Sequence, residues 1–130
     1  MKRSLYFLFG GALLAAVAMA QETPSYDGTW RGTHKTKSGT DMVVELTIKG
    51  QGGMWQWDRQ NGKWSWSCAG HEFPIVVQNS TSTELTIRIE AEKEVKGCGD
   101  SVVSLKLVDG NRGLEGAFQR SGSAVKLTRQ

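Results

Sequence analysis

From Tyr26 to the end of the chain, apolar and polar side chains alternate with a period of two, and no stretch carries a helical stripe. This alternation is typical of strands with one buried face and one solvated face. The expected strands cover residues 29–36, 41–49, 54–59, 63–68, 74–78, 83–91, 101–108, 114–120 and 124–129. Short breaks rich in Gly, Asn, Asp and Ser separate them, which favours sequential antiparallel hairpins.

Each strand presents one apolar face. In the strand expected over residues 41–49, for example, the apolar positions share one side, which carries Met42, Val44, Leu46 and Ile48. Eight or nine such strands are more than an open sheet of this size comfortably leaves exposed. The sequence therefore predicts an all-β fold, an antiparallel up-and-down β-barrel of 8–9 strands around a single core.

The first twenty residues have the composition of a secretory signal peptide. Lys2 and Arg3 precede an apolar run, which ends in the small residues of Ala18-Met19-Ala20. Such an A-x-A site predicts cleavage before Gln21. We therefore expect a signal peptide over 1–20, a single barrel domain over 21–130, no membrane anchor in the mature chain, and a periplasmic or secreted protein.

The two cysteines, Cys68 and Cys98, support the same compartment. In an exported protein, two thiols most simply form one disulfide bond. The 130-residue chain has a formal net charge of +3, with 16 Lys+Arg and 13 Asp+Glu. The leader contains two of the cations, so the remaining chain has 14 − 13 = +1. Its cations are scattered rather than gathered in a stripe, which argues against nucleic acid as a partner.

Four of the five tryptophans fall in MWQWDRQNGKWSWSC, residues 54–68. Its Asn-Gly pair favours a two-residue type I′ hairpin turn, because both residues tolerate a positive φ. That turn would pair Trp57 with Trp66, Gln56 with Ser67, and Trp55 with Cys68. One face of the hairpin would then carry Trp55, Trp57, Arg59, Trp64, Trp66 and Cys68. The opposite face is wholly polar, so this face is expected to point inward.

Two interpretations of these tryptophans stay open. The stronger is core packing, because aromatic pairs stabilise a sheet from within. The alternative is a ligand-binding wall, with Trp55, Trp57, Arg59, Trp64 and Trp66 as candidate residues. Indoles stack on flat apolar ligands and on the apolar faces of sugars, and a barrel of about eight strands can hold one small ligand.

The two ends of the chain carry a further pattern. The first strand opens with YDGTWRG, and the last reads AVKLTR, with Arg129 on the inward face. This resembles the calycin group, which includes lipocalins, fatty-acid-binding proteins and avidins, and also small exported bacterial β-barrel proteins of unassigned function. The resemblance implies an up-and-down barrel in which Trp30 closes one end and packs under Arg129.

The residues offer little for catalysis. The only histidines are His34, on the inward parity of the first strand, and His71, beside Glu72. Neither belongs to a metal-binding or nucleophile motif, so we expect no enzyme, no metal and no cofactor. The run EAEKEVK over 90–96 indicates a solvated strand end and turn.

These observations favour a non-enzymatic protein that binds a small apolar or glycan-like ligand. The alternative is a protein-interaction module, such as an inhibitor of a secreted hydrolase or an immunity-type protein of the periplasm. Its contacts would come from the loops KTKSG, AGHEF and KEVKGCGD.

Overall fold

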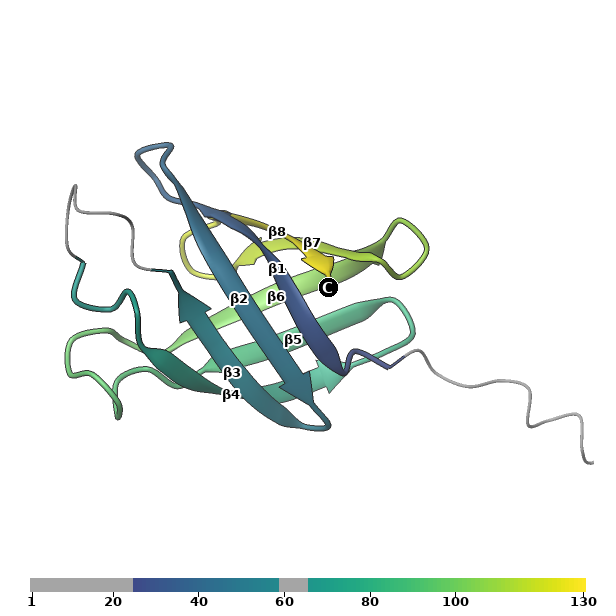
Figure 1. Cartoon of the computed structure of the whole chain (residues 1–130), viewed down its shortest axis with the longest axis horizontal. Helices are drawn as coiled ribbons and strands as arrows, with labels where there is room; N and C mark the ends of the chain where they lie inside the picture. Colours follow the sequence, from purple (N-terminus) through teal and green to yellow (C-terminus); the bar gives the residue numbers. More distant parts are fainter. Residues whose placement is uncertain (1–24, 59–65) are drawn as a thin grey trace, which may run out of the picture.

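Eight antiparallel strands close into a barrel in the computed structural model of the chain, which describes residues 25–58 and 66–130 (Figure 1). The strands are β1 (Gly28–Lys35), β2 (Asp41–Lys49), β3 (Gly52–Trp57), β4 (Glu72–Ser80), β5 (Glu84–Ile89), β6 (Ser101–Val108), β7 (Gly113–Phe118) and β8 (Ala124–Arg129). Each strand pairs with the next along the chain, and β8 pairs with β1. The predicted up-and-down barrel is confirmed, with eight strands.

The inward positions of the strands form a single core. Alternate residues of β2 are almost fully buried, as the period-two pattern predicts, and the same holds for Leu85, Ile87 and Ile89 in β5. Leu105 in β6 and Leu127 in β8 are buried in the same core. Closing the sheet satisfies the backbone groups that an open sheet leaves at its edges.

Glycines allow the strands to approach closely where the barrel bends. Gly32 of β1 and Gly116 of β7 both occupy inward positions, where neighbouring strands carry apolar side chains. A Cβ atom at Gly32 would collide with the carbonyl oxygen of Lys126, and one at Gly116 with that of Ser104. A residue without a side chain is therefore needed at both points.

Residues 66–70 correct one predicted element. The strand expected over 63–68 is wrong for the part that the structure describes, because Trp66 to Gly70 form a turn in which Ala69 N donates to Trp66 O. β3 instead pairs with β4, with Trp55 opposite Phe73 and Gln56 opposite Glu72. The expected pairs of Trp55 with Cys68, Gln56 with Ser67 and Trp57 with Trp66 do not form a ladder. The Asn61-Gly62 turn lies outside the described residues.

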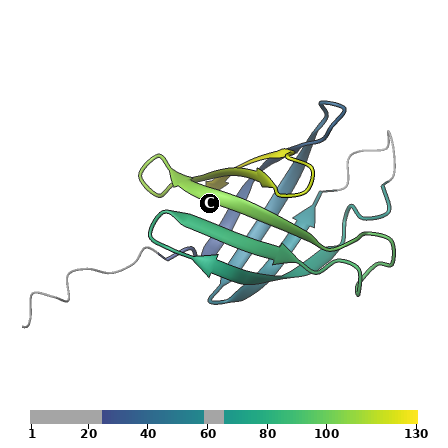
Figure 2. The ribbon, with the colours of Figure 1, turned by 180° about the vertical axis from the view of Figure 1, so that it is seen from behind.

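The up-and-down order places alternate connections at opposite ends of the barrel (Figures 1 and 2). One end carries the β2–β3, β4–β5 and β6–β7 turns together with residues 25–27, and we call it the closed end. The other, which we call the loop end, carries the longer connections, over residues 36–40, 90–100 and 119–123, together with the described parts of the β3–β4 connection, residues 58 and 66–71. Within the described residues, no helix has the length and apolar character needed to cross a bilayer.

Candidate functional site

Trp55 and Trp57 point into the barrel, as predicted. Their exposed fractions are 0% and 4%, and in the β2–β3 ladder they lie opposite Leu46 and Val44 of β2. The ring of Trp57 lies 5.6 Å from that of Trp55, 6.0 Å from Phe73 and 6.3 Å from Phe118, measured between centroids. These two indoles are therefore part of the packed core. The other candidates on the same predicted face, Arg59 and Trp64, lie outside the described residues.

A cluster of rings closes the core at the loop end. It consists of His34, Trp57, Trp66 and Phe118, and we call it the mouth cluster. Trp66 is half-buried, and its ring meets that of Trp57 edge-on with centroids 4.9 Å apart. His34 lies inward, as its parity in β1 predicts, with its ring 4.4 Å from that of Phe118. Edge-on and tilted contacts of this kind are favourable for aromatic rings.

His34 and Trp57 are also joined by a hydrogen bond. The indole Nε1 of Trp57 donates to Nδ1 of His34 over 3.1 Å, so the imidazole is neutral and carries its proton on Nε2. Burial lowers the pKa of His34 below its ordinary value of 6.5. Trp55 Nε1 is also buried, but it has no partner within the described chain. The indole N–H of Trp57 is therefore hydrogen-bonded to a titratable side chain.

The closed end shows the arrangement predicted for Trp30 and Arg129. The guanidinium of Arg129 lies 4.2 Å from the centre of the Trp30 ring, and Trp30 is fully buried. Arg129 also donates to the backbone carbonyls of Ser25, Asp27 and Asn111. These contacts join the N-terminal segment, β8 and the β6–β7 turn across the end of the barrel.

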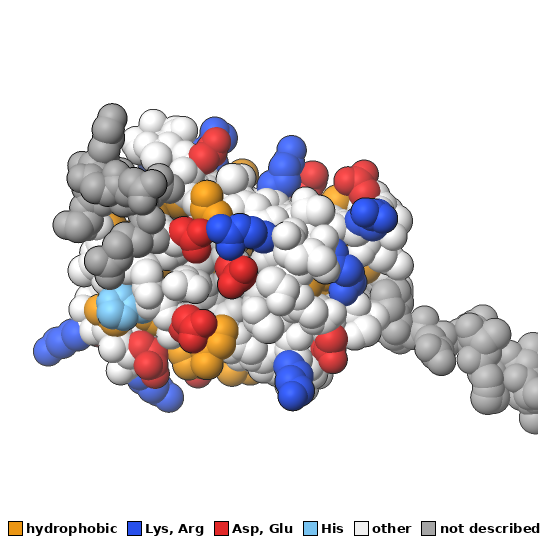
Figure 3. All heavy atoms as spheres, viewed as in Figure 1, with side chains coloured by type: hydrophobic (Ala, Val, Ile, Leu, Met, Phe, Trp, Pro, Cys, Tyr) orange, Lys and Arg blue, Asp and Glu red, His pale blue; other side chains and the backbone are white. Residues whose placement is uncertain are grey.

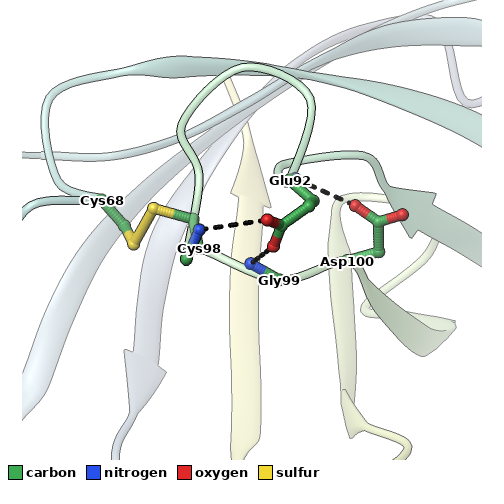
Figure 4. Close-up of a disulfide and its surroundings, with 6 residues drawn as sticks. Cys68, Glu92, Cys98, Gly99 and Asp100 are labelled. Atoms are coloured by element: carbon green, nitrogen blue, oxygen red, sulfur yellow. Dashed lines mark hydrogen bonds between the residues drawn. A yellow bond between two sulfur atoms is a disulfide. The ribbon is translucent and has the colours of Figure 1, made fainter.

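The predicted disulfide between Cys68 and Cys98 is present, with the two Cα atoms 5.7 Å apart. It joins the turn over residues 66–70 to the β5–β6 connection (Figure 4). Inside this connection the carboxylate of Glu92 accepts hydrogen bonds from the backbone N–H groups of Gly97 and Gly99. The acidic run around Glu92 thus belongs to an ordered turn, as its charge pattern indicated.

Asp100 fixes the end of the same connection. Its carboxylate accepts a hydrogen bond from Glu92 N over 3.0 Å and forms an ion pair of 2.9 Å with Arg88. The Glu92 N–H and the Arg88 guanidinium together hold the pKa of Asp100 below its usual range. The disulfide therefore links two connections at the loop end, and carboxylates also hold one of them, the 90–100 connection, in place.

A groove of about 820 Å³ opens beside this connection. One side is formed by residues 98–100 and the other by residues 118–121, with Val102 and Arg88 between them. Phe118 belongs both to this groove and to the mouth cluster, so the two features adjoin. Arg120 is exposed on the rim of the groove and makes no ion pair with the described residues.

Five hollows lined wholly by described residues lie on the outside and at the ends of the barrel, and neither Trp55 nor Trp57 lines these five. His71 is exposed beside Phe73, with ring centroids 6.2 Å apart. Across residues 25–58 and 66–130, no three His, Cys, Asp or Glu side chains gather as metal ligands would. The groove and the mouth cluster together form the candidate site, and both lie at the loop end.

Comparison with known proteins finds no match. No protein-family model, curated protein or solved structure is significantly similar to this chain. The calycin-like relationship consequently stays a prediction, which rests on the closed end alone.

Sequence reasoning missed the groove and the part that Phe118 plays in it. Arg88, Val102 and Arg120 come from three separate parts of the chain, and the groove exists because the 90–100 connection and the 119–123 turn leave the barrel on either side of β6. The one available indication was topological. The loops KTKSG, AGHEF and KEVKGCGD each follow an odd-numbered strand, so an up-and-down order places all three at one end.

Proposed function

We propose that this chain is an exported, non-enzymatic binding protein whose loop end docks a partner protein, in the manner of an inhibitor of a secreted hydrolase or an immunity-type protector. The observation that carries the proposal is the groove of about 820 Å³ between the 90–100 connection and the 119–123 turn. Binding residues commonly reside on loops that a rigid scaffold positions. Here the scaffold is a closed barrel.

The filled interior supports this choice over a ligand held inside the barrel. Trp55, Trp57 and Phe73 occupy the space in front of β3, with exposed fractions of 0%, 4% and 0%. A ligand that entered there would have to displace packed rings, and packed cores tolerate added volume poorly. The open space that could receive a partner lies instead at the end of the barrel.

The charge and leader of the chain fit an exported protein. Residues 1–20 have the composition of a signal peptide, from which we infer export to the periplasm or the extracellular space. The disulfide is compatible with an oxidising compartment. Cationic and anionic side chains are interspersed on the face seen in Figure 3. Such a surface offers a nucleic acid no stripe of cations to follow.

A second candidate function is the binding of a small flat ligand, such as a sugar or an aromatic compound, at the mouth cluster. The observation in its favour is the half-buried indole of Trp66, which rests against Trp57 at the end of the barrel. A ligand there would stack on Trp66 rather than enter the core. We propose a calycin-like relationship together with this second candidate, because it would agree with a small ligand bound at the mouth of the barrel.

The test uses two matched arginine variants. Arg120→Glu changes the rim of the groove, whereas Arg112→Glu makes the same change on an exposed residue of the β6–β7 turn at the closed end. The mature chain and both variants are immobilised and exposed to the secreted or periplasmic fraction of the host. We expect the mature chain and Arg112→Glu to retain one protein at a fixed stoichiometry. Arg120→Glu should retain at least about tenfold less of that protein.

The partner is then mixed with the mature chain, and backbone hydrogen exchange is measured for free and bound protein. Protection over residues 97–102 and 118–121 would support the proposed surface. Protection at the closed end, or equal capture by Arg120→Glu and Arg112→Glu, would contradict it. The second candidate would be favoured if no protein is captured and a small molecule changes the tryptophan fluorescence of the mature chain but not that of Trp66→Phe.

A further inference from the structure

We propose that His34 is a pH sensor that loosens the loop end of the barrel when its imidazole is protonated. The inference starts from the bond between Trp57 Nε1 and His34 Nδ1, which is 3.1 Å long. It also uses the position of the ring, which lies against Phe118 with centroids 4.4 Å apart. The chain contains only two histidines, so the effect of each can be measured separately.

The hydrogen bond tolerates only neutral histidine. An indole N–H can donate but cannot accept, whereas a protonated imidazole carries hydrogen on both nitrogens. Protonation at Nδ1 would therefore place two donors against each other. The indole N–H of Trp57 would lose its partner inside a partly buried cluster, and the charged ring would favour water over the face of Phe118.

Among the described residues, no acidic side chain forms an ion pair with His34. The elements packed around His34 are β2 and β8, its neighbours in the sheet, and the ends of β3 and β7, which contribute Trp57 and Phe118. The ionisable side chains that the described residues place near this end are exposed or half-buried at the surface, and they are Arg31, Lys35, Asp41, Asp58, Arg120 and Lys126. Burial lowers the pKa of His34, and the hydrogen bond from Trp57 favours the same neutral form.

Trp57 connects the imidazole to the loops. Its backbone carbonyl accepts a hydrogen bond of 2.7 Å from Gly70 N, and its ring supports Trp66. The turn over residues 66–70 contains Cys68, which is bonded to Cys98 on the edge of the groove. A change at Trp57 can therefore reach the surface that the proposed function assigns to a partner. That consequence rests on the proposed function, whereas the sensor itself does not.

The test follows both histidines and the indole groups by NMR in the mature, disulfide-bonded chain from pH 8 to pH 4. His71→Asn assigns the two imidazole signals, since His71 is exposed and is the matched control. We expect His34 to titrate below 6.5, its ordinary value, and one indole N–H signal, absent in Trp57→Phe, to shift with the same midpoint. The indole shift should persist in His71→Asn and vanish in His34→Phe.

A second variant keeps the test decisive if His34→Phe fails to fold. Trp57→Phe removes the donor that favours the neutral imidazole, so its His34 should titrate at a higher pH than in the parent chain. An indole signal of Trp57 that stays constant through the titration of His34 would overturn the proposal. So would a His34 midpoint that is unchanged by Trp57→Phe. Because no partner is used, either result would leave the proposed binding function standing.

Discussion

Arg129 shows how one side chain can join several segments of this barrel. Its guanidinium stacks on Trp30 and donates to three backbone carbonyls, two of which belong to the segment that precedes β1. A planar fork with five N–H groups can make these contacts together, whereas a lysine ammonium is a compact point charge. Parity in the last strand was enough to predict the inward position of Arg129, but not its three carbonyl partners.

The variant Arg129→Lys should therefore destabilise the protein although it keeps the charge. We expect a loss of about 1 to 2 kcal/mol in the free energy of unfolding, measured by urea denaturation, because the stacking and most of the hydrogen bonds are lost. Arg112→Lys is the control, since the side chain of Arg112 is exposed, and its loss should stay within about 0.5 kcal/mol. Equal stability of the two variants would show that the fork contributes nothing.

His34 should also make the stability of the protein depend on pH. Because burial lowers its pKa in the folded state, the unfolded chain binds more protons between 6.5 and that lowered value. The free energy of unfolding should thus be constant just above pH 6.5 and fall as the pH drops below it. Urea denaturation at a series of pH values should show this slope in the parent chain and not in His34→Phe.

Carboxylates titrate in a lower pH range than histidines do. Asp100 has a lowered pKa, so its contribution is present at neutral pH and is lost only as the pH falls below about 4. A loss of stability between pH 6.5 and 5 that is the same in His34→Phe as in the parent chain would contradict the role given to the histidine.

Two glycines, Gly116 in β7 and Gly52 in β3, allow the close approach of neighbouring strands to be tested. Gly116→Ala would place a methyl group against the backbone carbonyl of Ser104, whereas a Cβ at Gly52 has its nearest neighbour, the carbonyl oxygen of Ile75, at 3.7 Å. We expect Gly116→Ala to lose at least about 2 kcal/mol of stability, or to fail to fold, because the β6–β7 pair must separate. Gly52→Ala should change stability by less than about 1 kcal/mol. Thermal unfolding by circular dichroism measures both, and similar melting temperatures would rule out the close approach.

Strand positions could largely be predicted from sequence, because alternation and turn residues are local properties. The expected ranges 41–49, 101–108 and 124–129 agree with the structure residue for residue. The failure over the described residues 66–68 has a physical reason. A Trp-Ser-Trp-Ser-Cys run alternates like a strand, yet Ala69 and Gly70 close a turn onto Trp57, and Gly70 adopts a positive φ of 84° there. Trp66 still meets Trp57, but through ring contact instead of ladder pairing.

At the scale of the whole molecule, the barrel separates a filled core from an irregular loop end. Parity in β3 predicted that Trp55 and Trp57 point inward. It could not predict whether space remains in front of them, because Phe73 and Phe118 arrive from distant strands. The groove depends likewise on where two loops leave the barrel, which is a property of the closed fold and not of any local pattern.

A filled barrel requires that Trp57 be a core residue rather than the wall of a ligand cavity. The most direct test is urea denaturation of Trp57→Phe beside Trp66→Phe, a matched change on the half-buried neighbour. Trp57→Phe should lose about 1.5 to 3 kcal/mol, because it removes buried contacts and the hydrogen bond to His34, whereas Trp66→Phe should lose less than about 1 kcal/mol. If Trp57→Phe unfolds at the same urea concentration as the parent chain, the ring is not packed and the filled barrel is contradicted.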